Sequence, residues 1–282
     1  MTRRLIVTAD DFGASTAINH AVERGHGEGC LTAASLMVTG DAVDDAVARA
    51  RRLPELGVGL HLVLVEGRPA LPPAALPALV DASGHFRTDM ARLGADIFFK
   101  PAARRQLRAE IAAQFAAFAA TGLPLDHVNA HKHFHLHPTI AGIILEVGRG
   151  YGMKAMRAPV EPIAILRGIE PVQQAAATRI ADLWARLLRR RLRRAGMVVP
   201  DQVFGLAWSG AMTAVRVASL IDRAPMGITE LYLHPATDKV GTGHAPGYRY
   251  TDEFAALIDP GVRQAITRSG ARLTPFAALT EA

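Results

Sequence analysis

Short apolar runs rich in β-branched residues alternate along the chain with longer segments in which apolar residues recur every three or four positions. The short runs predict buried strands, and the longer segments predict amphipathic helices. The predicted strands cover residues 5–7, 31–38, 57–64, 125–133, 154–159, 203–208, 228–233 and 273–276. The predicted helices cover residues 14–28, 41–53, 102–120, 138–147, 173–194, 213–223 and 252–269.

This alternation of strand and helix predicts an α/β fold, because consecutive parallel strands need helical crossovers between them. Seven or eight such units in 282 residues favour one domain over residues 1–282. We expect a TIM-like (β/α) barrel that is either complete or incomplete and distorted. An open doubly wound sheet is the alternative, but no glycine-rich dinucleotide fingerprint follows the first strand, which counts against its Rossmann version.

Residues 66–101 interrupt the alternation. Prolines at 69, 72, 73 and 77 and glycines at 67, 84 and 94 leave no long periodic element there. A segment of this length without regular structure is usually functional when it lies inside a compact domain. We expect a lid or substrate-binding insert, with an inert surface excursion as the alternative.

Composition indicates the cellular compartment of the protein. Half of the residues are hydrophobic, and the single cysteine, Cys30, excludes an intramolecular disulfide and a multi-cysteine metal site. The first residues pass directly into a strand with no secretory h-region, and no apolar stretch approaches the ~20 residues of a membrane span. These features predict a cytoplasmic protein.

Polar residues suited to catalysis gather at the carboxyl ends of the predicted strands, the face of a barrel where active sites are assembled. They are Asp10, Asp11, His61, His131, Arg157, Trp208 and His234. Two adjacent aspartates at the end of a buried strand are costly unless a cation or a base pairs with them. Neighbouring side chains on a strand point to opposite faces, so both aspartates can face one cleft only if the chain leaves extended geometry there. The alternative is that one of them caps the following helix.

A cluster of histidines occupies the end of the predicted strand at 125–133. On a regular strand residues 127, 129, 131 and 133 share one face, and neutral imidazoles bind Zn²⁺ and similar ions readily. The alternative is a polar, hydrogen-bonded face of the barrel, which we favour for His135 and His137. For His131, together with His61 and Asp11, we favour a metal site.

Two histidines and one carboxylate with an open coordination position make a hydrolytic metal site. We expect one divalent ion; Zn²⁺ suits this donor set, with Mg²⁺ and Mn²⁺ as alternatives. Asp10 is the candidate general base, and Arg157 beside it would keep that carboxylate ionised by lowering its pKa. His234 is the candidate acid that protonates the leaving group. The alternatives are a surface arginine at position 157 and a helix-capping histidine at position 234.

Four stretches resemble the YdjC-like carbohydrate deacetylases, which include the chitooligosaccharide deacetylases. They are 8–13 (Thr-Ala-Asp-Asp-Phe-Gly), 59–62 (Gly-Leu-His-Leu), 131–135 (His-Lys-His-Phe-His) and 233–235 (Leu-His-Pro). The resemblance spans nearly the whole chain and implies a barrel-like fold and metal-dependent removal of an N-acetyl group from an amino sugar. Carried over residue by residue, it implies the metal ligands Asp11, His61 and His131, with Asp10 as base and His234 as acid.

Within that family the chain most resembles the hopanoid-biosynthesis-associated deacetylases, through residues 129–138, residues 156–162 and the arginine-rich helix. This branch implies an acetylglucosaminyl hopanoid lipid as the substrate. Asn129 and Lys132 stand where the chitooligosaccharide enzymes tend to carry an acid and a histidine. Trp208 and His133 are the candidates for substrate contact. Trp208 would stack on the sugar ring, with a place in the core as its alternative.

The predicted helix at 173–194 is amphipathic and strongly basic. Arginines at 186, 189, 190, 191, 193 and 194 account for much of the net charge of +6, and apolar residues recur between them at helical spacing. Such a helix can lie on anionic lipid, which would place the protein at the inner face of the membrane. The alternatives are packing on the barrel and RNA binding. No recognised nucleic-acid module accompanies the arginines, so we expect no nucleic-acid partner.

Two further classes of function remain open. A metal-dependent phosphoesterase would use similar ligands, but it would also need basic phosphate-binding groups in the cleft. A carbohydrate- or lipid-binding barrel without activity would not need an intact catalytic set, whereas this chain has Asp10, Asp11, His61, His131 and His234.

Overall fold

The computed structural model describes residues 2–173, 176–238 and 245–280. Its centre is a seven-stranded sheet in which six strands follow the order β4-β3-β2-β1-β6-β5, while β7 pairs with the start of β1. All of these pairings are parallel. The strands are β1 (Arg3–Phe12), β2 (Ala33–Leu36), β3 (Gly57–Leu62), β4 (Val128–Ala130), β5 (Gln202–Phe204), β6 (Gly227–Leu233) and β7 (Arg272–Leu273).

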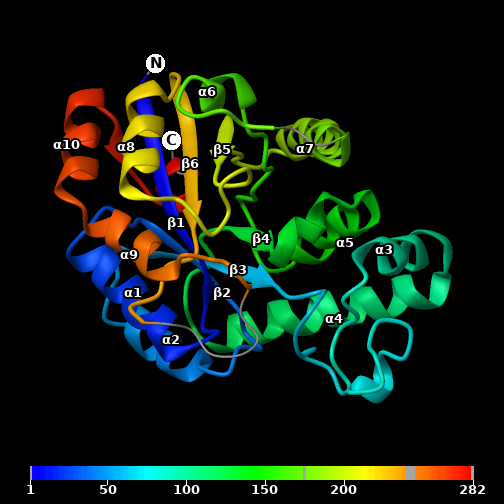
Figure 1. The fold of residues 1–282 in the computed structure, drawn as a ribbon. Helices are drawn as coiled ribbons and strands as arrows, with labels where there is room; N and C mark the ends of the chain where they lie inside the picture. The colour runs from blue at the N-terminus through cyan, green and yellow to red at the C-terminus, as the bar shows by residue number, and fades with distance from the viewer. Residues whose placement is uncertain (1, 174–175, 239–244, 281–282) are drawn as a thin grey trace.

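The sheet curls into a half-barrel, with helices packed around its outer side (Figure 1). The α-helices are α1 (Thr16–Gly27), α2 (Val43–Ala50), α3 (Met90–Phe99), α4 (Pro101–Ala120), α5 (Pro138–Arg149), α6 (Ile163–Arg167), α7 (Ala176–Arg194), α8 (Ala214–Arg223), α9 (Tyr250–Ile258) and α10 (Pro260–Ser269). Short 3₁₀ segments are η1 (Pro73–Ala75), η2 (His131–Leu136) and η3 (Ala277–Leu279). The prediction of an incomplete, distorted (β/α) barrel is confirmed.

The barrel is incomplete between β4 and β5. The predicted strand at 154–159 is reduced there to two isolated parallel bridges, from Val128 to Met156 and from Ala155 to Val198. A longer ladder cannot form, because β4 has only three residues and Pro159 lacks the N–H group that a ladder needs. Extended backbone rather than a regular strand therefore spans this side of the barrel.

Side chains of β1 alternate between two surroundings. Leu5 and Val7 pack in the main core with residues of the helices, whereas Ile6 belongs to a separate small apolar cluster. Thr8 and Asp10 follow Ile6 on the same face and bond to polar side chains from other elements. The interior of the half-barrel therefore changes from apolar to polar toward the carboxyl ends of the strands.

The insert at 66–101 contains more regular structure than its prolines and glycines predict. Helix α3 begins after Asp89, whose side chain accepts a hydrogen bond from the backbone N–H of Arg92. Its buried positions include Leu93, Gly94 and Ile97, so a glycine that reads as a helix breaker lies on the packed face. The expectation of no long periodic element is wrong for residues 90–99.

The predicted helix at 252–269 is two helices. Asp259 has extended backbone (φ −69°, ψ 130°) between α9 and α10, because a residue before proline avoids the helical region. The Asp259 side chain then caps α10 by accepting from the N–H groups of Gly261 and Val262. None of the described helices is both long and apolar enough to cross a membrane.

Helix α7 packs one face on the rest of the protein. Ala185, Leu188 and Leu192 are buried on that face. Of the predicted helix at 173–194, positions 174 and 175 lie outside the described residues. The alternative in which this helix packs on the barrel therefore accounts for one of its faces only.

Candidate metal centre

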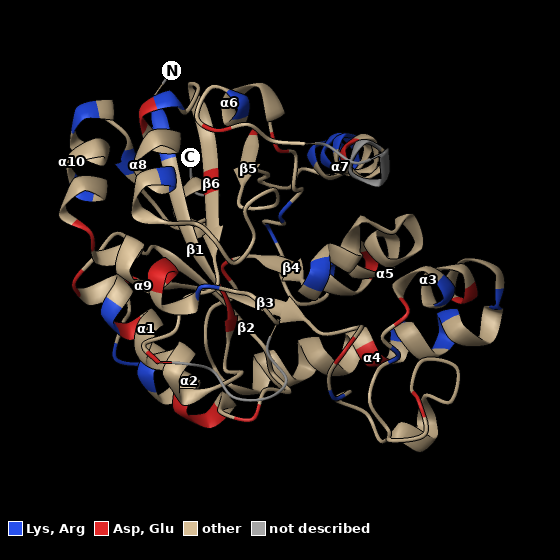
Figure 2. Ribbon diagram, in the orientation of Figure 1, with Lys and Arg blue, Asp and Glu red and all other residues tan. Residues whose placement is uncertain are grey.

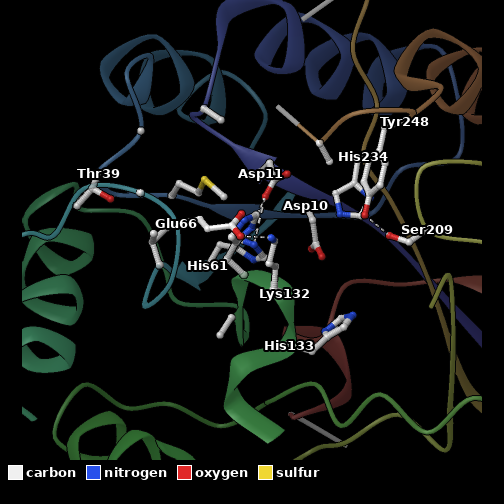
Figure 3. A pocket seen from close by; sticks show the side chains of 18 of the residues that line it. Asp10, Asp11, Thr39, His61, Glu66, Lys132, His133, Ser209, His234 and Tyr248 are labelled. Carbon is white, nitrogen blue, oxygen red and sulfur yellow. Dashed lines mark hydrogen bonds and ion pairs between the residues drawn. The ribbon is translucent and has the colours of Figure 1, made fainter. Parts of the chain in front are cut away.

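The end of β1 departs from regular strand geometry. The pairing of β1 with β2 shifts register between Ala9 and Phe12, and Asp11 adopts a left-handed φ of 63°. On a regular strand Asp10 and Asp11 would point to opposite faces. Instead both line one cavity of about 660 Å³ (Figure 3), so the departure that the sequence requires of such a pair is present.

Asp11 meets two histidines in this cavity. Its Oδ1 atom lies 3.3 Å from Nε2 of His61 on β3, and 3.3 Å from Nδ1 of His131, which directly follows β4. The three donor atoms lie within 4.8 Å of one another. Ligand bonds of about 2.0–2.1 Å at the tetrahedral angle would put neighbouring donor atoms roughly 3.3 Å apart. The spacing therefore suits a single tetrahedral ion such as zinc.

The hydrogen bond on the far side of His61 leaves its other nitrogen free for such an ion. Nδ1 of His61 lies 2.6 Å from the amide oxygen of Asn129, which can only accept, so the proton of the neutral ring belongs on Nδ1. The lone pair of Nε2 then faces Oδ1 of Asp11, and both atoms are buried without a hydrogen bond. Two buried lone pairs repel each other unless a cation lies between them. These residues therefore fit a divalent cation.

The pKa values of Asp11 and His61 both shift in the direction that favours the charged form of the group. Burial raises the pKa of Asp11, but the adjacent His131 and His61 side chains outweigh this effect and hold that pKa well below its usual range. Burial lowers the pKa of His61, but the Asp10 and Asp11 carboxylates outweigh it and raise the pKa overall. Two carboxylates thus draw positive charge to one point, where a divalent cation would be stabilised.

Arg157 ties two buried carboxylates together beside the cavity. Its Nη1 donates to Oδ2 of Asp10 over 2.6 Å and its Nη2 donates to Oδ1 over 3.0 Å, which makes the pair bidentate. Nε and Nη2 also donate to Oε1 of Glu230 on β6. Burial raises the pKa of Asp10, yet the Arg157 guanidinium and His61 outweigh it and hold that pKa well below its usual range. Arg157 is fully buried, so the alternative of a surface arginine is wrong.

A network of buried side chains continues from Asn129 into the barrel. Nδ2 of Asn129 donates to Oδ1 of Asp10, a carboxylate that can only accept, so the amide orientation is fixed. The same nitrogen donates to Oγ of Ser35, which lies 2.9 Å from Nε2 of His127. Nδ1 of His127 lies 2.8 Å from Oδ2 of Asp126. The network thereby holds Asn129, and through it His61, in one orientation.

Aromatic side chains bound another side of the cavity (Figure 3). Nε2 of His133 lies 2.9 Å from the hydroxyl of Tyr232, whose ring centroid is 5.7 Å from that of His234. The His234 ring lies 5.1 Å from the ring of Tyr248, and the Tyr248 hydroxyl lies 2.6 Å from Oγ of Ser209. Nδ1 of His234 is buried and lies 3.9 Å from Oε2 of Glu253, while the ring itself lines the cavity.

Backbone strain is concentrated around this cavity. Within residues 2–173, 176–238 and 245–280, the non-glycine residues with positive φ all line it; they are Asp11, Glu66, Lys132 and His133. Such conformations cost about 1–3 kcal/mol each and cluster at functional sites. Lys132 also forms an ion pair with Glu66, which joins the turn after β4 to the insert at 66–101.

The left-handed turn corrects one strand prediction. Lys132 and His133 both have a φ of 53°, and β4 ends at Ala130, so the strand does not continue to residue 133. His133 consequently leaves the strand face that residues 127 and 129 share. It still lines the cavity, because the turn directs its ring toward Tyr232.

Of the predicted site residues, Asp10, Asp11, His61, His131, His133 and His234 line the cavity, Arg157 adjoins it, and Trp208 lies apart. The predicted strand at 203–208 ends at Phe204, because Gly205 adopts a φ of 131°. Trp208 is buried, with the Arg216 guanidinium 4.8 Å from its ring centre. This position matches the alternative prediction for Trp208, a place in the core.

Some residues in or next to the cavity were not predicted from the sequence as parts of the site. Tyr232 precedes His234 by two positions, so the alternation of a strand could have placed both on one face. The three hydrogen bonds of the Asn129 amide were also not predicted, although its register opposite His61 follows from strand pairing. Tyr248 lies in a loop with no periodic signal, and only tertiary structure brings it to the cavity.

A curled parallel half-barrel with an Asp-His-His cluster at its strand ends defines an α/β protein with a candidate metal centre. The chain belongs to the YdjC-like protein family, whose sequence profile matches residues 4–268. The family prediction made from the four short stretches is confirmed.

Relatives support this assignment over the full chain. A carbohydrate deacetylase from Geobacillus stearothermophilus is 30% identical over 280 residues, which cover 98% of each chain. A chitooligosaccharide deacetylase from Serratia marcescens is 31% identical over 160 residues, covering 54% of this chain and 58% of its own. A crystal structure from Enterococcus faecalis, named for cellobiose-phosphate cleavage, superposes with a TM-score of 0.76 at 24% identity, with 99% of each chain covered. That structure supports the fold alone.

Proposed function

We propose that this protein is a metal-dependent carbohydrate deacetylase that hydrolyses the N-acetyl group of an N-acetylglucosamine unit. The observation that carries the proposal is the pair of buried, unbonded atoms, Oδ1 of Asp11 and Nε2 of His61, that face each other beside His131. Relatives named carbohydrate deacetylases along the whole chain supply the reaction class.

Asp11, His61 and His131 would hold one divalent ion, with Zn²⁺ ahead of Mg²⁺ or Mn²⁺ because two of the three donors are imidazoles. When bound, the ion supplies Lewis acidity that polarises an amide carbonyl and acidifies water. The remaining chemistry falls to neighbouring side chains that already line the same cavity.

Asp10 is the proposed proton acceptor. Arg157 keeps it ionised. Its Oδ1 accepts from both Arg157 and Asn129, whereas Oδ2 accepts one hydrogen bond from Arg157 and so retains a lone pair for the proton. It takes a proton from the water whose oxygen adds to the acetamide carbon. His234 is the proposed donor that protonates the leaving nitrogen as the C–N bond breaks. The products are acetate and a free amine.

The cavity walls suit a sugar with an apolar attachment. His133 offers a polar edge and Tyr248 an aromatic ring, and Met37, Val63 and Leu206 add apolar surface. We propose that His133 contacts the substrate, whereas buried Trp208 lacks access to it. We further propose that the chain is one deacetylase domain and that residues 66–101 act as a lid, since Glu66, Arg68 and His85 of this insert line the cavity.

For the substrate we propose an acetylglucosaminyl hopanoid lipid, on the motif resemblance and on the basic character of α7. A lipid-linked sugar requires the protein to work at a membrane surface, and we propose a peripheral position at the cytoplasmic face. Soluble chitooligosaccharides are the second candidate, favoured by the named activity of the Serratia marcescens relative.

A phosphoesterase is disfavoured by the charges of the cavity. Among the described residues that line it, the basic side chains are Arg68 and Lys132, and each is already paired, with Asp41 and Glu66 respectively. A phosphate group would have to compete with those carboxylates for its counter-charge.

One panel assay tests the proposal. The purified protein is incubated with N-acetylglucosamine, chitobiose, a detergent-dispersed acetylglucosaminyl hopanoid and p-nitrophenyl phosphate, and acetate and phosphate are measured. We expect acetate from N-acetylated sugars, fastest from the glycolipid, and no phosphate. Phosphate release, or no acetate from any sugar, would contradict the proposed function. Equal rates on chitobiose and the glycolipid would contradict the lipid substrate alone.

A further inference from the structure

The outward face of α7 carries an apolar stripe that is exposed. Ile180, Leu183, Trp184 and Leu187 follow the i, i+3, i+4, i+7 spacing of one helix face, and they are 61%, 58%, 42% and 43% exposed. Ala185, Leu188 and Leu192 form the buried face of the same helix. An exposed stripe of this size, including a tryptophan, marks an interaction surface.

The same face becomes basic in the last turns of α7. Arg190, Arg191 and Arg194 continue the spacing of the apolar stripe by ten, eleven and fourteen residues from Ile180. Arg189 and Arg193, in contrast, are turned toward Asp201 and serve the fold. The outward face of α7 is therefore apolar at its beginning and cationic at its end.

Arg191 connects this face to a basic groove. The groove, of about 560 Å³, lies between α4, α5 and α7 and is lined by Arg104, Arg105, Arg108 and Arg191 against a single carboxylate, Glu146. Nη1 of Arg191 donates to the backbone oxygen of Pro138 over 3.1 Å, which fixes the position of the side chain. Arg108 is paired with Glu146, and the other three arginines of the groove form no ion pair with any described residue.

A second apolar patch lies at the other side of the groove. Phe98 and Phe99 at the end of α3 are 50% and 74% exposed, with ring centroids 5.0 Å apart. Pro101, two residues after Phe99, lines the groove, and the Phe98 ring lies 6.1 Å from that of His137, which precedes the groove residue Pro138. Figure 1 shows α3, α5 and α7 along the same side of the molecule.

We infer that this surface, formed by the α7 stripe, the arginine groove and the Phe98–Phe99 patch, docks the protein on a bilayer that contains anionic phospholipid. The groove matches negative headgroups in charge, and the two flanking patches match the interfacial region, where tryptophan, leucine and phenylalanine partition. The inference rests on the proposed function for its choice of a lipid surface rather than a protein partner. It goes beyond α7, because it assigns the start of α4 and the end of α3 to the contact.

This arrangement also links docking to the catalytic cavity. The segment that carries Phe98 and Phe99 is the insert at 66–101, whose Glu66, Arg68 and His85 line that cavity. Because α3 is part of this insert, contact of α3 with the bilayer would also affect the segment proposed as the lid.

Vesicle sedimentation tests the inference without reference to catalysis. The full chain is mixed with phosphatidylcholine vesicles, with or without phosphatidylserine, at rising salt. We expect binding to the anionic vesicles to be at least tenfold tighter than binding to the zwitterionic ones, with affinity falling as salt rises. The groove variant R104Q/R105Q/R191Q should lose tenfold or more in affinity, and the stripe variant W184S/L187S should lose a similar factor. The control R223Q/R263Q/R268Q removes the same charge from α8 and α10, on another side of the molecule (Figure 2), and should bind as the parent does.

Three results would overturn the docking inference. They are equal binding to both kinds of vesicle, loss of affinity in the control equal to that in the groove variant, and a dimer seen by light scattering that W184S/L187S dissociates. Turnover of a soluble N-acetyl sugar is measured in parallel and should be the same in all variants. Vesicle binding without acetate release would contradict the proposed function and leave docking intact, whereas acetate release without vesicle binding would contradict docking alone.

Discussion

Nδ1 of His61 lies 2.6 Å from Oδ1 of Asn129, across the register in which residue 61 of β3 pairs with residue 129 of β4. The amide cannot turn over, because its nitrogen donates to Asp10 and to Ser35. One asparagine therefore sets the tautomer of a proposed metal ligand and contacts the proposed base. Supporting hydrogen bonds of this kind orient metal ligands in other proteins.

Asn129→Ala is expected to weaken metal binding, because His61 would lose the acceptor that holds its proton on Nδ1. Loss of such a supporting bond typically costs about 10–100-fold in metal affinity or activity. Competition with a chelating dye measures the affinity. Asn129→Asp retains an acceptor oxygen and should restore part of it. Unchanged affinity in Asn129→Ala would show that the bond to His61 has no positioning role.

His61→Ala and His131→Ala should each abolish stoichiometric metal binding, since either change leaves two donors where three are needed. Elemental analysis of the purified variants measures this. His85→Ala is the matched control, because His85 lines the same cavity away from the Asp11 cluster and should leave the metal content unchanged. Metal retained in both cluster variants would place the ion elsewhere.

Asp10→Asn should keep the metal and lose most of the rate. Removing a general base typically costs about 10²–10⁴-fold. Steady-state acetate release and metal content are measured on the same preparation. A variant that folds but binds no metal would make Asp10 a ligand, and the division of roles between the two aspartates would then be wrong.

Gly59→Ala should destabilise the fold through the network beneath the site. A Cβ atom at residue 59 would lie 2.5 Å from the His127 ring, which is held on both sides by Ser35 and Asp126. Overpacking of this kind costs about 1–3 kcal/mol.

Gly27→Ala is the control for that change, because a Cβ atom at this helical position meets nothing within 4 Å. It should stabilise the protein by about 0.4–1 kcal/mol. Urea unfolding measures both variants. Equal stability of the two would mean that the His127 ring can move aside freely.

The sequence predicts the fold class and the common location of the site because both follow from simple alternation. Parallel strands joined by helices bring their carboxyl ends to one face, where most of the predicted site residues lie. Even the irregularity at Asp11 can be anticipated, since two adjacent inward side chains are incompatible with a regular strand.

Features that depend on the sign of φ or on distant partners could not be predicted. Nothing in the pattern at 131–133 indicates that Lys132 and His133 adopt left-handed backbone and end β4. Gly205 likewise turns the chain out of β5 and carries Trp208 into the core. Helix α7 appears in the pattern as one amphipathic helix, whereas only tertiary packing separates its buried leucines from its exposed ones.

The most direct test of the central claim is acetate release by the protein after chelation and during stepwise return of Zn²⁺. We expect the chelated protein to release no acetate from an N-acetylglucosaminyl substrate. Activity should then rise in proportion to added metal and level off at one ion per chain, with no recovery in His61→Ala. A chelated protein that releases acetate at the full rate, or a metal-loaded protein that releases none, would contradict metal-dependent deacetylation.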